Sequence, residues 1–485
     1  KKLDDDAVRA FRDRFNIPIS DKQLAEAEQV PFYHPGEDSP EVQYLKERRA
    51  ALGGYLPQRR RKASKSFAVP GLDKFERLLK SSGDRAYSTT MAFVQTLNIA
   101  LRDKEIGPRL VPIVADEART FGMEGLFRQI GIYAPFGQKY KPVDADQLMY
   151  YREDQTGQVL QQGISEPGAI ASWMAAGTSY SVSDVPMLPF YIYYSMFGFQ
   201  RVGDIAWQAA DMRTRGFLLG GTSGRTTLNG EGLQHEDGHS HLLAGAIPNC
   251  RSYDPTFGYE VTVIMQHGMK AMLEDQIDEY YYITLMNENY THPEMPEGAA
   301  EGIIKGMYLL TDAGKPKKGG LRVQLMGSGT ILREAIAAAE LLDKDFGVTA
   351  DIWSCPSFTE LRRDGFDVER WNRFNPEAKK PRKAYVTELL EDHQGPAIAA
   401  TDYVRAYADQ IRAFVPMHYT VLGTDGFGRS DTRDNLRRHF EVDRFHIAHA
   451  AIDALVKDGR MTAKDAARAI KLYKIDTDRP NPLLA

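Results

Sequence analysis

Short apolar runs that are followed by glycine-bearing or charged loops recur along this chain, and they constrain its fold more than any other feature. The first half contains such runs at 110–115, 187–194 and 217–219, and the second half at 322–326, 351–353 and 419–422. Helical patterns separate them, as over 331–346, where Gly347 marks the end of the helix. Runs of this kind are typical of buried parallel strands. The sequence therefore predicts an α/β fold with mainly parallel sheets.

Three segments differ in pattern along the 485 residues, a length that allows two or three domains. Residues 1–68 indicate helices separated by polar and proline breaks, so we expect a connecting arm. Residues 69–305 alternate between helical and strand patterns, with helical spacing over 72–101. Residues 306–485 predict a second α/β unit.

Composition excludes several classes of protein. A net charge of -5 and a pI near 6.2 give no global attraction to nucleic acid, and the basic run 59–62 indicates an exposed linker. The most apolar run, 185–199, is too short to span a bilayer, so we expect no membrane association. Cys250 and Cys355 are the only cysteines, which cannot build a disulfide framework and fit a reducing cytoplasm.

A glycine-rich stretch, residues 220–241, holds three of the eleven histidines within seven residues. We call it the His235 loop. Its candidate metal ligands are His235, Glu236, Asp237, His239 and His241. A zinc pair at i and i+4 needs a helix, and Gly238 interrupts one here.

Two other interpretations of the His235 loop stay open on chemical grounds. Its imidazoles could serve a polar catalytic loop that hydrogen-bonds and exchanges protons with an anionic substrate. Alternatively, the histidines could only satisfy backbone carbonyls on a surface loop. Three clustered imidazoles favour a site over a plain surface loop.

Four stretches together resemble the bacterial homodimeric pyruvate dehydrogenases, which are the decarboxylating first components of the pyruvate dehydrogenase complex. They are 116–125, 193–201, the His235 loop and 424–430, and the similarity continues to the last residue. The resemblance implies a transketolase-like fold of two three-layer α/β/α domains with mainly parallel sheets, preceded by the helical arm. Residues 69–305 would form the pyrimidine-binding middle domain and 306–485 the C-terminal domain.

The resemblance also implies an activity and its partners. Such an enzyme decarboxylates pyruvate oxidatively on thiamine diphosphate and acetylates the lipoyl group of a dihydrolipoyl acetyltransferase, feeding acetyl-CoA synthesis. It works as a cytoplasmic homodimer. The family holds the diphosphate and Mg²⁺ through a Gly-Asp-Gly motif, which this chain lacks. We therefore expect those ligands on an N-terminal domain outside this chain, no metal ligand within it, and no activity from the chain alone.

Three residues match cofactor-binding positions of the family. Glu166 matches the glutamate that hydrogen-bonds the pyrimidine N1′, Phe197 matches the aromatic residue that stacks on the pyrimidine, and Ile164 matches the apolar residue that keeps the cofactor bent. Without the family, Glu166 before Pro167 would indicate only a charge in a first helical turn. Phe197 would be assigned to the core.

Four further residues match positions near the substrate. Tyr194 and His235 match groups that face the reacting carbonyl, where they could stabilise developing negative charge and move protons. Glu117, with Asp116 beside it, matches an acidic contributor.

Several alternatives remain open at this point. Another thiamine diphosphate enzyme, such as a transketolase or a different 2-oxo acid dehydrogenase, would share the fold. A zinc hydrolase would use the His235 loop as its metal site. A non-catalytic unit for dimerisation and docking is the third alternative.

Overall fold

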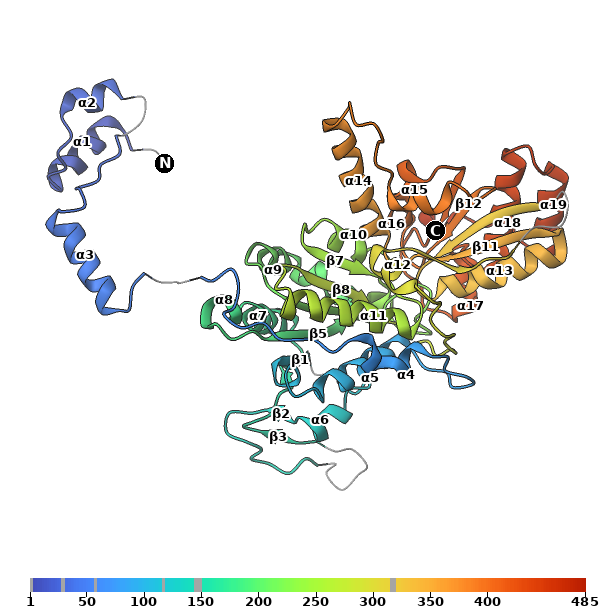
Figure 1. Ribbon diagram of the computed structural model, residues 1–485, viewed down its shortest axis with the longest axis horizontal. Coiled ribbons are helices and arrows are strands. Elements are labelled where there is room, and N and C mark those ends of the chain that lie inside the picture. Colours follow the sequence, from blue (N-terminus) through green and yellow to red (C-terminus); the bar gives the residue numbers. More distant parts are fainter. Residues whose placement is uncertain (1–2, 28–30, 56–58, 116–117, 144–150, 315–319) are drawn as a thin grey trace. The chain divides into compact units, whose positions relative to one another are not determined.

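The computed structural model describes residues 3–27, 31–55, 59–115, 118–143, 151–314 and 320–485 (Figure 1). The chain divides into two compact units, Lys1–Arg59 and Arg60–Ala485. The division falls within the basic run, so residues 60–68 of the predicted arm belong to the second unit. Phe67, for example, donates its backbone N–H to the carbonyl of Leu273 at 3.1 Å.

The described residues of the first unit form three helices, and each begins at a side-chain cap. Asp4, Ser20 and Ser39 accept backbone N–H groups at the start of these helices, as N-cap residues do. None of the three helices has a buried residue. They are α1 (Asp5–Arg14), α2 (Asp21–Glu26) and α3 (Pro40–Ala51).

A six-stranded sheet forms the first lobe of the second unit. Its order is β4-β1-β5-β6-β8-β7, and every neighbouring pair is parallel. All carboxyl ends therefore meet at one edge. The strands are β1 (Leu110–Val114), β4 (Leu160–Gln161), β5 (Leu188–Tyr194), β6 (Gly216–Gly221), β7 (Cys250–Tyr253) and β8 (Tyr280–Thr284).

Helices cover both faces of this sheet, because alternate side chains of each strand point to opposite faces. Along β5, Phe190 and Ile192 pack in the cluster that contains α5 (Thr89–Leu101) and α11 (Gly258–Met269). Tyr191 and Tyr193 pack with α7 and α9 instead. The first lobe thus has three layers. The helices on the second face are α7 (Glu166–Gly177), α9 (Phe199–Asp211) and α10 (Ser240–Gly245).

A five-stranded sheet forms the second lobe, in the order β13-β12-β10-β11-β9. Three of its pairs are parallel, and the edge strand β9 is antiparallel to β11. A mostly parallel sheet with one antiparallel edge strand is common in α/β folds. The strands are β9 (Tyr308–Thr311), β10 (Leu321–Gly327), β11 (Val348–Ser354), β12 (Ala397–Ala400) and β13 (Tyr419–Leu422).

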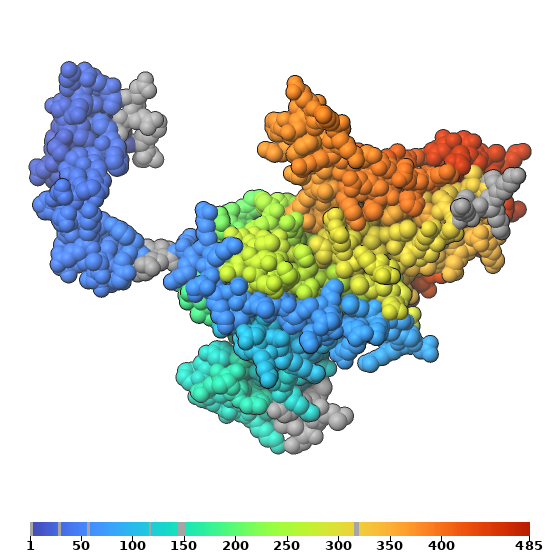
Figure 2. All heavy atoms as spheres, in the orientation of Figure 1, coloured from blue at the N-terminus to red at the C-terminus, as the bar shows by residue number. Residues whose placement is uncertain are grey.

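The second lobe is also layered. One face packs on α13 (Ile331–Phe346) and α18 (Arg444–Lys457), and the other on α14 (Phe358–Phe374) and α15 (Tyr385–Leu390). The end of α14 projects from the surface (Figure 2). The remaining elements are α4 (Glu76–Leu79), α6 (Gly125–Gln129), α8 (Ser179–Ser183), α12 (Ala299–Lys305), α16 (Ala406–Asp409), α17 (Arg433–His439), α19 (Ala463–Leu472), β2 (Ile132–Tyr133) and β3 (Glu153–Asp154).

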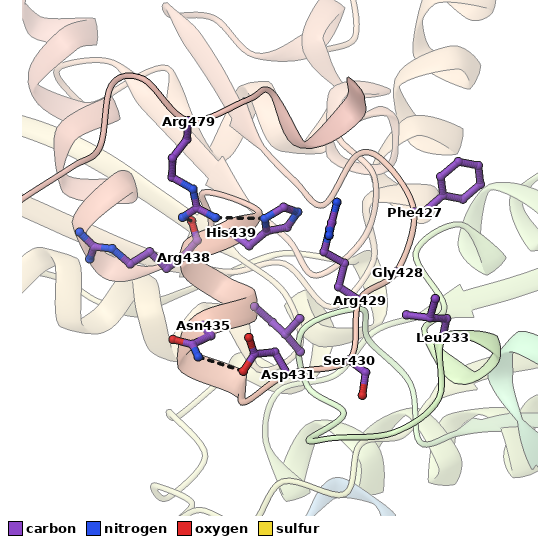
Figure 3. Close-up of a pocket in the computed structure, with 11 residues that line it drawn as sticks. Leu233, Phe427, Gly428, Arg429, Ser430, Asp431, Asn435, Arg438, His439 and Arg479 are labelled. Carbon is purple, nitrogen blue, oxygen red and sulfur yellow. Dashed lines mark hydrogen bonds between the residues drawn. The ribbon is translucent and has the colours of Figure 1, made fainter. Parts of the chain in front are cut away.

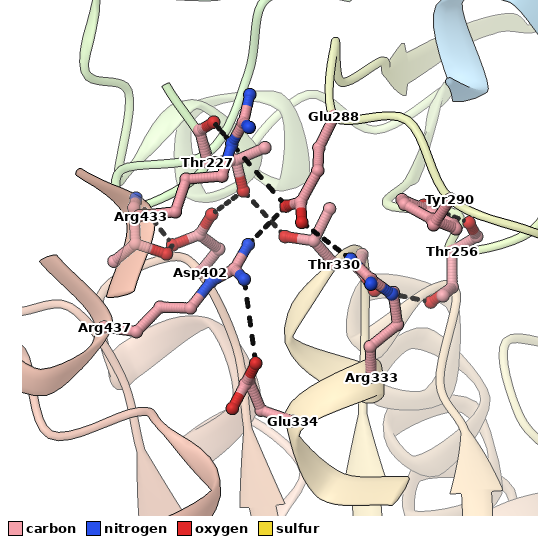
Figure 4. Close-up of polar contacts among 12 residues, drawn as sticks. Thr227, Thr256, Glu288, Tyr290, Thr330, Arg333, Glu334, Asp402, Arg433 and Arg437 are labelled. Carbon is pink, nitrogen blue, oxygen red and sulfur yellow. Dashed lines mark hydrogen bonds and ion pairs between the residues drawn. The ribbon is translucent and has the colours of Figure 1, made fainter. Parts of the chain in front are cut away.

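A buried ionic network joins the two lobes (Figure 4). Glu288, which follows β8, accepts hydrogen bonds from Arg333 Nη1 at 2.7 Å and Arg437 Nη2 at 2.5 Å. Arg437 also lies 3.6 Å from Glu334 of α13. Burial alone would raise the pKa of Glu288, but Arg437 and Arg333 outweigh it and hold the pKa below its usual value. Glu288 is therefore a largely shielded carboxylate, with a side chain 12% exposed, that depends on its arginine partners.

One predicted helical stretch is divided in the structure. The helical spacing over 72–101 predicts helix there, and the structure forms two separate α-helices in this range, α4 and α5. Gly83 and Asp84 form a turn between them, closed by the N–H of Arg85 on the carbonyl of Ser82, and Ser88 begins α5 by accepting the N–H of Met91. The apolar periodicity on both sides of the turn conceals the break.

No helix in the part of the chain that the structure describes is long and apolar enough to cross a membrane.

Candidate active site

The predicted site residues that the structure describes lie at the carboxyl edge of the first lobe's sheet. Glu166 and Ile164 follow β4, Tyr194 ends β5, Phe197 lies just after it, and His235 belongs to the loop after β6. Ligands of open parallel sheets bind at this edge. Three neighbouring loops thus supply residues that lie far apart in the sequence.

Three aromatic rings gather there. The ring centroids of Tyr194 and His235 are 4.8 Å apart, and those of Phe197 and His235 are 5.1 Å apart. Tyr194 also packs against Phe121 at 5.3 Å. The rings of Tyr194, Phe197 and His235 are only partly buried. The structure therefore brings three of the predicted residues into one cluster that solvent can reach.

Glu166 is placed by the start of α7. Ser165 is the N-cap and accepts the backbone N–H of Gly168 at 3.3 Å. Pro167 occupies the first turn, where its missing N–H costs nothing. A carboxylate in this turn is stabilised by the helix dipole, so the local sequence fixes Glu166 at the edge of the sheet.

The Glu166 carboxylate is largely shielded and is hydrogen-bonded to an arginine that contacts the aromatic cluster. Its side chain is 13% exposed, and Oε1 accepts a hydrogen bond from Arg201 Nη1 at 3.1 Å. The same guanidinium lies over the ring of Phe197, 4.1 Å from its centroid. Burial, together with the negative charge of Glu166, raises the pKa of Tyr191 above its usual value. Arg201 thus connects Glu166 to Phe197.

Of the described residues that were predicted, Ile164 is not brought into this cluster. Ile164 is 79% exposed and is not a member of the buried clusters. Asp116 and Glu117 lie outside the described residues. The roles of all three stay predictions.

Glu236, the neighbour of His235, connects the His235 loop to the glycine-rich loop 424–430. Its side chain is buried, and Oε2 accepts the backbone N–H of Arg429 at 2.7 Å. Its Oε1 has no hydrogen-bond partner among the described residues, and burial raises the pKa of Glu236 to about 7. Gly428 allows this approach, because a Cβ there would lie 2.7 Å from the Cβ of Glu236.

The other polar residues of the His235 loop have structural contacts. His241 Nδ1 and Nε2 lie 2.6 Å from Ser252 Oγ and 2.9 Å from Thr284 Oγ1, and burial lowers its pKa to about 3. Asp237 accepts the N–H groups of His239 and Ser240 at the start of α10. Among the described residues, no group of three or more His, Cys, Asp or Glu side chains could hold a metal ion. This geometry does not favour the zinc hydrolase.

Sequence reasoning missed the importance of Arg201, Phe121 and Glu236. Arg201 and Phe121 lie inside the stretches that carry the family resemblance, yet neither was assigned a role. The spacing of Phe197 and Arg201 gave no helical signal, because Phe197 ends a short 3-10 turn and α9 begins only at Phe199. A buried Glu236 had no local signal, because glutamate is mostly exposed.

Glu236→Gln is expected to change how stability depends on pH. A folded pKa of about 7, against an ordinary value of 4.5, means that the acid stabilises the fold below pH 4.5 and that this contribution is lost as pH rises through 7. Urea unfolding should show the variant gaining roughly 2 kcal/mol relative to the native chain between pH 5 and pH 8. Glu231→Gln, an exposed glutamate of the same loop, is the control. Parallel pH profiles for Glu236→Gln and the native chain would contradict the expectation.

Comparisons with known proteins agree with this architecture. Residues 68–293 match the pyruvate dehydrogenase E1 component middle domain, and residues 306–443 match the transketolase-like TK C-terminal domain. The pyruvate dehydrogenase E1 component of Pseudomonas aeruginosa is 61% identical over 484 residues, which cover 100% of this chain and 54% of that protein.

Solved transketolases share the fold. Transketolase from Leishmania mexicana aligns with a TM-score of 0.58 and 15% identity, over 96% of this chain and 57% of that one. A split-gene transketolase, solved as an inactive β4 tetramer, aligns with a TM-score of 0.51 and 14% identity, over 76% of this chain and 98% of that one.

The fold and its carboxyl-edge site define the class of this chain as a transketolase-like α/β protein. Within that class, residues 68–293 belong to the family of pyruvate dehydrogenase E1 component middle domains, and the whole chain is homologous to pyruvate dehydrogenase E1 components. The resemblance drawn from the sequence is confirmed. The chain spans about half the length of the curated relatives that it matches.

Proposed function

We propose that this chain supplies the middle and C-terminal domains, 69–305 and 306–485, of a pyruvate dehydrogenase E1 component. The enzyme would decarboxylate pyruvate on thiamine diphosphate and acetylate the lipoyl group of a dihydrolipoyl acetyltransferase, feeding acetyl-CoA synthesis in the cytoplasm. Homology over the whole chain supports this proposal.

The observation that carries the proposal is the contact pattern of Arg201. Its planar guanidinium lies over Phe197 while it donates an N–H to Glu166. The cluster therefore accepts a flat, cationic group that stacks on one residue and hydrogen-bonds the other. A protonated aminopyrimidine has the same two properties, so these side chains fit the pyrimidine of thiamine diphosphate.

Each of the chain's site residues would have a separate role in cofactor binding or in catalysis. Glu166 would hold a proton at the pyrimidine nitrogen, Phe197 would orient the ring, and Ile164 would be covered by the cofactor. When bound, thiamine diphosphate supplies the electron sink for decarboxylation. Tyr194 and His235, whose rings are 4.8 Å apart, would donate hydrogen bonds to the substrate's carbonyl oxygen. Asp116 and Glu117 would add negative charge near the substrate.

The diphosphate and Mg²⁺ require ligands from another segment. We propose that this segment carries the diphosphate-binding domain and joins the chain in a homodimeric enzyme, called the assembled enzyme below. The inactive tetramer of the split-gene transketolase is consistent with a half-length chain that needs a companion.

The test compares the 485-residue chain alone with the assembled enzyme in a pyruvate decarboxylation assay. We expect turnover from the assembled enzyme and none from the chain alone. Turnover of sugar phosphates but not pyruvate would show a transketolase instead. An assembled enzyme that binds thiamine diphosphate and processes neither substrate would refute the catalytic proposal and leave a docking unit.

His235→Ala is expected to slow acetyl transfer to the lipoyl group by about 100-fold, the usual scale of a lost proton donor or acceptor. Reductive acetylation of a lipoyl domain by the assembled enzyme measures this rate, with thiamine diphosphate binding as a check on the fold. His34→Ala, an exposed histidine of the first unit, is the control. An unchanged rate in His235→Ala would limit this ring to packing against Tyr194 and Phe197.

A further inference from the structure

A second cavity lies beside the His235 loop, on the second lobe (Figure 3). Its volume is about 710 Å³, within the range of small-molecule sites. One wall comes from Leu233 of the His235 loop and the segment 427–431. The other comes from α17 and from Arg479 near the end of the chain. None of the residues assigned to catalysis lines it.

The cavity has an excess of positive charge. Arg429, Arg438 and Arg479 line it, against a single acidic residue, Asp431. Asp431 is already engaged, since its Oδ1 accepts hydrogen bonds from Asn435 Nδ2 at 2.9 Å and from a backbone N–H. Arg438 is partly neutralised by Asp443 at 3.6 Å. The charges of Arg429 and Arg479 are therefore the two that a ligand could neutralise.

Arg429 and Arg479 have no acidic partner within ion-pair distance among the residues that the structure describes. Arg479 donates only to neutral acceptors, the carbonyl of Arg438 at 3.2 Å and His439 Nδ1 at 3.0 Å. The backbone of Arg429 is held by its N–H bond to Glu236. A fixed backbone carrying an unneutralised guanidinium is suited to capture an anion.

The surroundings of His439 show the same excess of positive charge. Because an arginine can only donate, its bond to Nδ1 leaves the ring proton on Nε2, and that buried atom has no partner in the part of the chain that the structure describes. Burial, and then the positive charges of Arg429 and Arg479, lower the pKa of His439. Figure 3 shows Arg429, Arg479 and His439 gathered around the same space.

We propose that this cavity binds a small phosphorylated molecule, with its phosphate between Arg429 and Arg479 and its organic part against Leu233 and Leu436. A phosphate carries close to two negative charges and several acceptor oxygens, which match two guanidinium groups and the nearby donors Ser430 and Asn435. The cavity is much larger than phosphate alone. The apolar side chains of Leu233 and Leu436 would contact the organic part of the ligand.

Calorimetric titration of the 485-residue chain with phenyl phosphate tests the proposal. We expect a Kd below about 1 mM and weaker binding of inorganic phosphate, which lacks the apolar part. Arg429→Ala and Arg479→Ala should each weaken binding about tenfold. Arg460→Ala, an exposed arginine of the same lobe, should bind as the native chain does. Thermal melting confirms that each variant is folded.

Three results would overturn the proposal. The first is no heat from either phosphate probe. The second is equal weakening by Arg460→Ala, which would show only general charge attraction. The third is tight binding of an acidic peptide that phenyl phosphate does not displace, which would make the surface a protein-docking site. If a phosphopeptide competes with phenyl phosphate, the result supports recognition of a phosphate group. It also shows that the phosphate can belong to a phosphorylated protein segment.

Discussion

Glu166→Ala should lower the rate of pyruvate decarboxylation by the assembled enzyme between about 100-fold and 10,000-fold, the range of a lost general acid or base. The side chain is 13% exposed and is joined to Phe197 through Arg201. No other described carboxylate takes part in this aromatic and guanidinium contact. Removing it leaves Arg201 stacked on Phe197 without an anionic partner. A decarboxylation assay at saturating pyruvate and thiamine diphosphate measures the loss.

The stability of Glu166→Ala should change little. Arg201 is 50% exposed, and ion pairs of that exposure contribute at most about 1 kcal/mol. Glu301→Ala, which removes an exposed first-turn glutamate from α12, is the matched control for a lost helix-start charge. Decarboxylation by Glu166→Ala at the rate of Glu301→Ala would remove Glu166 from the mechanism.

Arg437→Ala should lower the free energy of unfolding by about 3–5 kcal/mol, the largest stability effect expected from a single substitution in this network. The Arg437 side chain is 5% exposed and lies between Glu288 and Glu334 (Figure 4). Its loss leaves the buried Glu334 and the largely shielded Glu288 each short of a positive partner. Urea unfolding of the 485-residue chain measures the difference.

A double variant tests whether the lost stability comes from carboxylates that lack a positive partner. Arg437→Met with Glu288→Gln roughly keeps the volume and removes the negative charge of Glu288 together with the positive charge of Arg437, so it should recover part of the loss. Arg460→Ala is the exposed control and should stay within about 0.5 kcal/mol of the native chain. A loss below about 1 kcal/mol for Arg437→Ala would show that solvent reaches Glu288 and Glu334.

Much of the fold follows from local pattern. The apolar runs at 110–115, 187–194, 322–326 and 419–422 correspond to β1, β5, β10 and β13, because a buried strand must be apolar on both faces. The helix that ends at Gly347 is α13, and Gly347 has a φ of 64°, which a glycine adopts without strain. The predicted α/β class with mainly parallel sheets is confirmed.

The site was only partly predictable. Glu166, Tyr194, Phe197 and His235 were chosen from motifs, and the fold brings them to one edge of a sheet. Arg201 was missed because its role depends on two partners from different loops, and no sequence pattern records that contact. The turn after α4 was missed for a related reason, since apolar spacing continues across it.

The bond between Glu236 and the backbone of Arg429 limits how relatives of this chain can be recombined. The carboxylate belongs to the first lobe, while the glycine that admits it, Gly428, belongs to the second. A chimera that joins the two lobes from different parents must inherit both residues together. A parent with a side chain at position 428 would displace Glu236, and with it the neighbouring His235, even when every motif of the first lobe is kept intact.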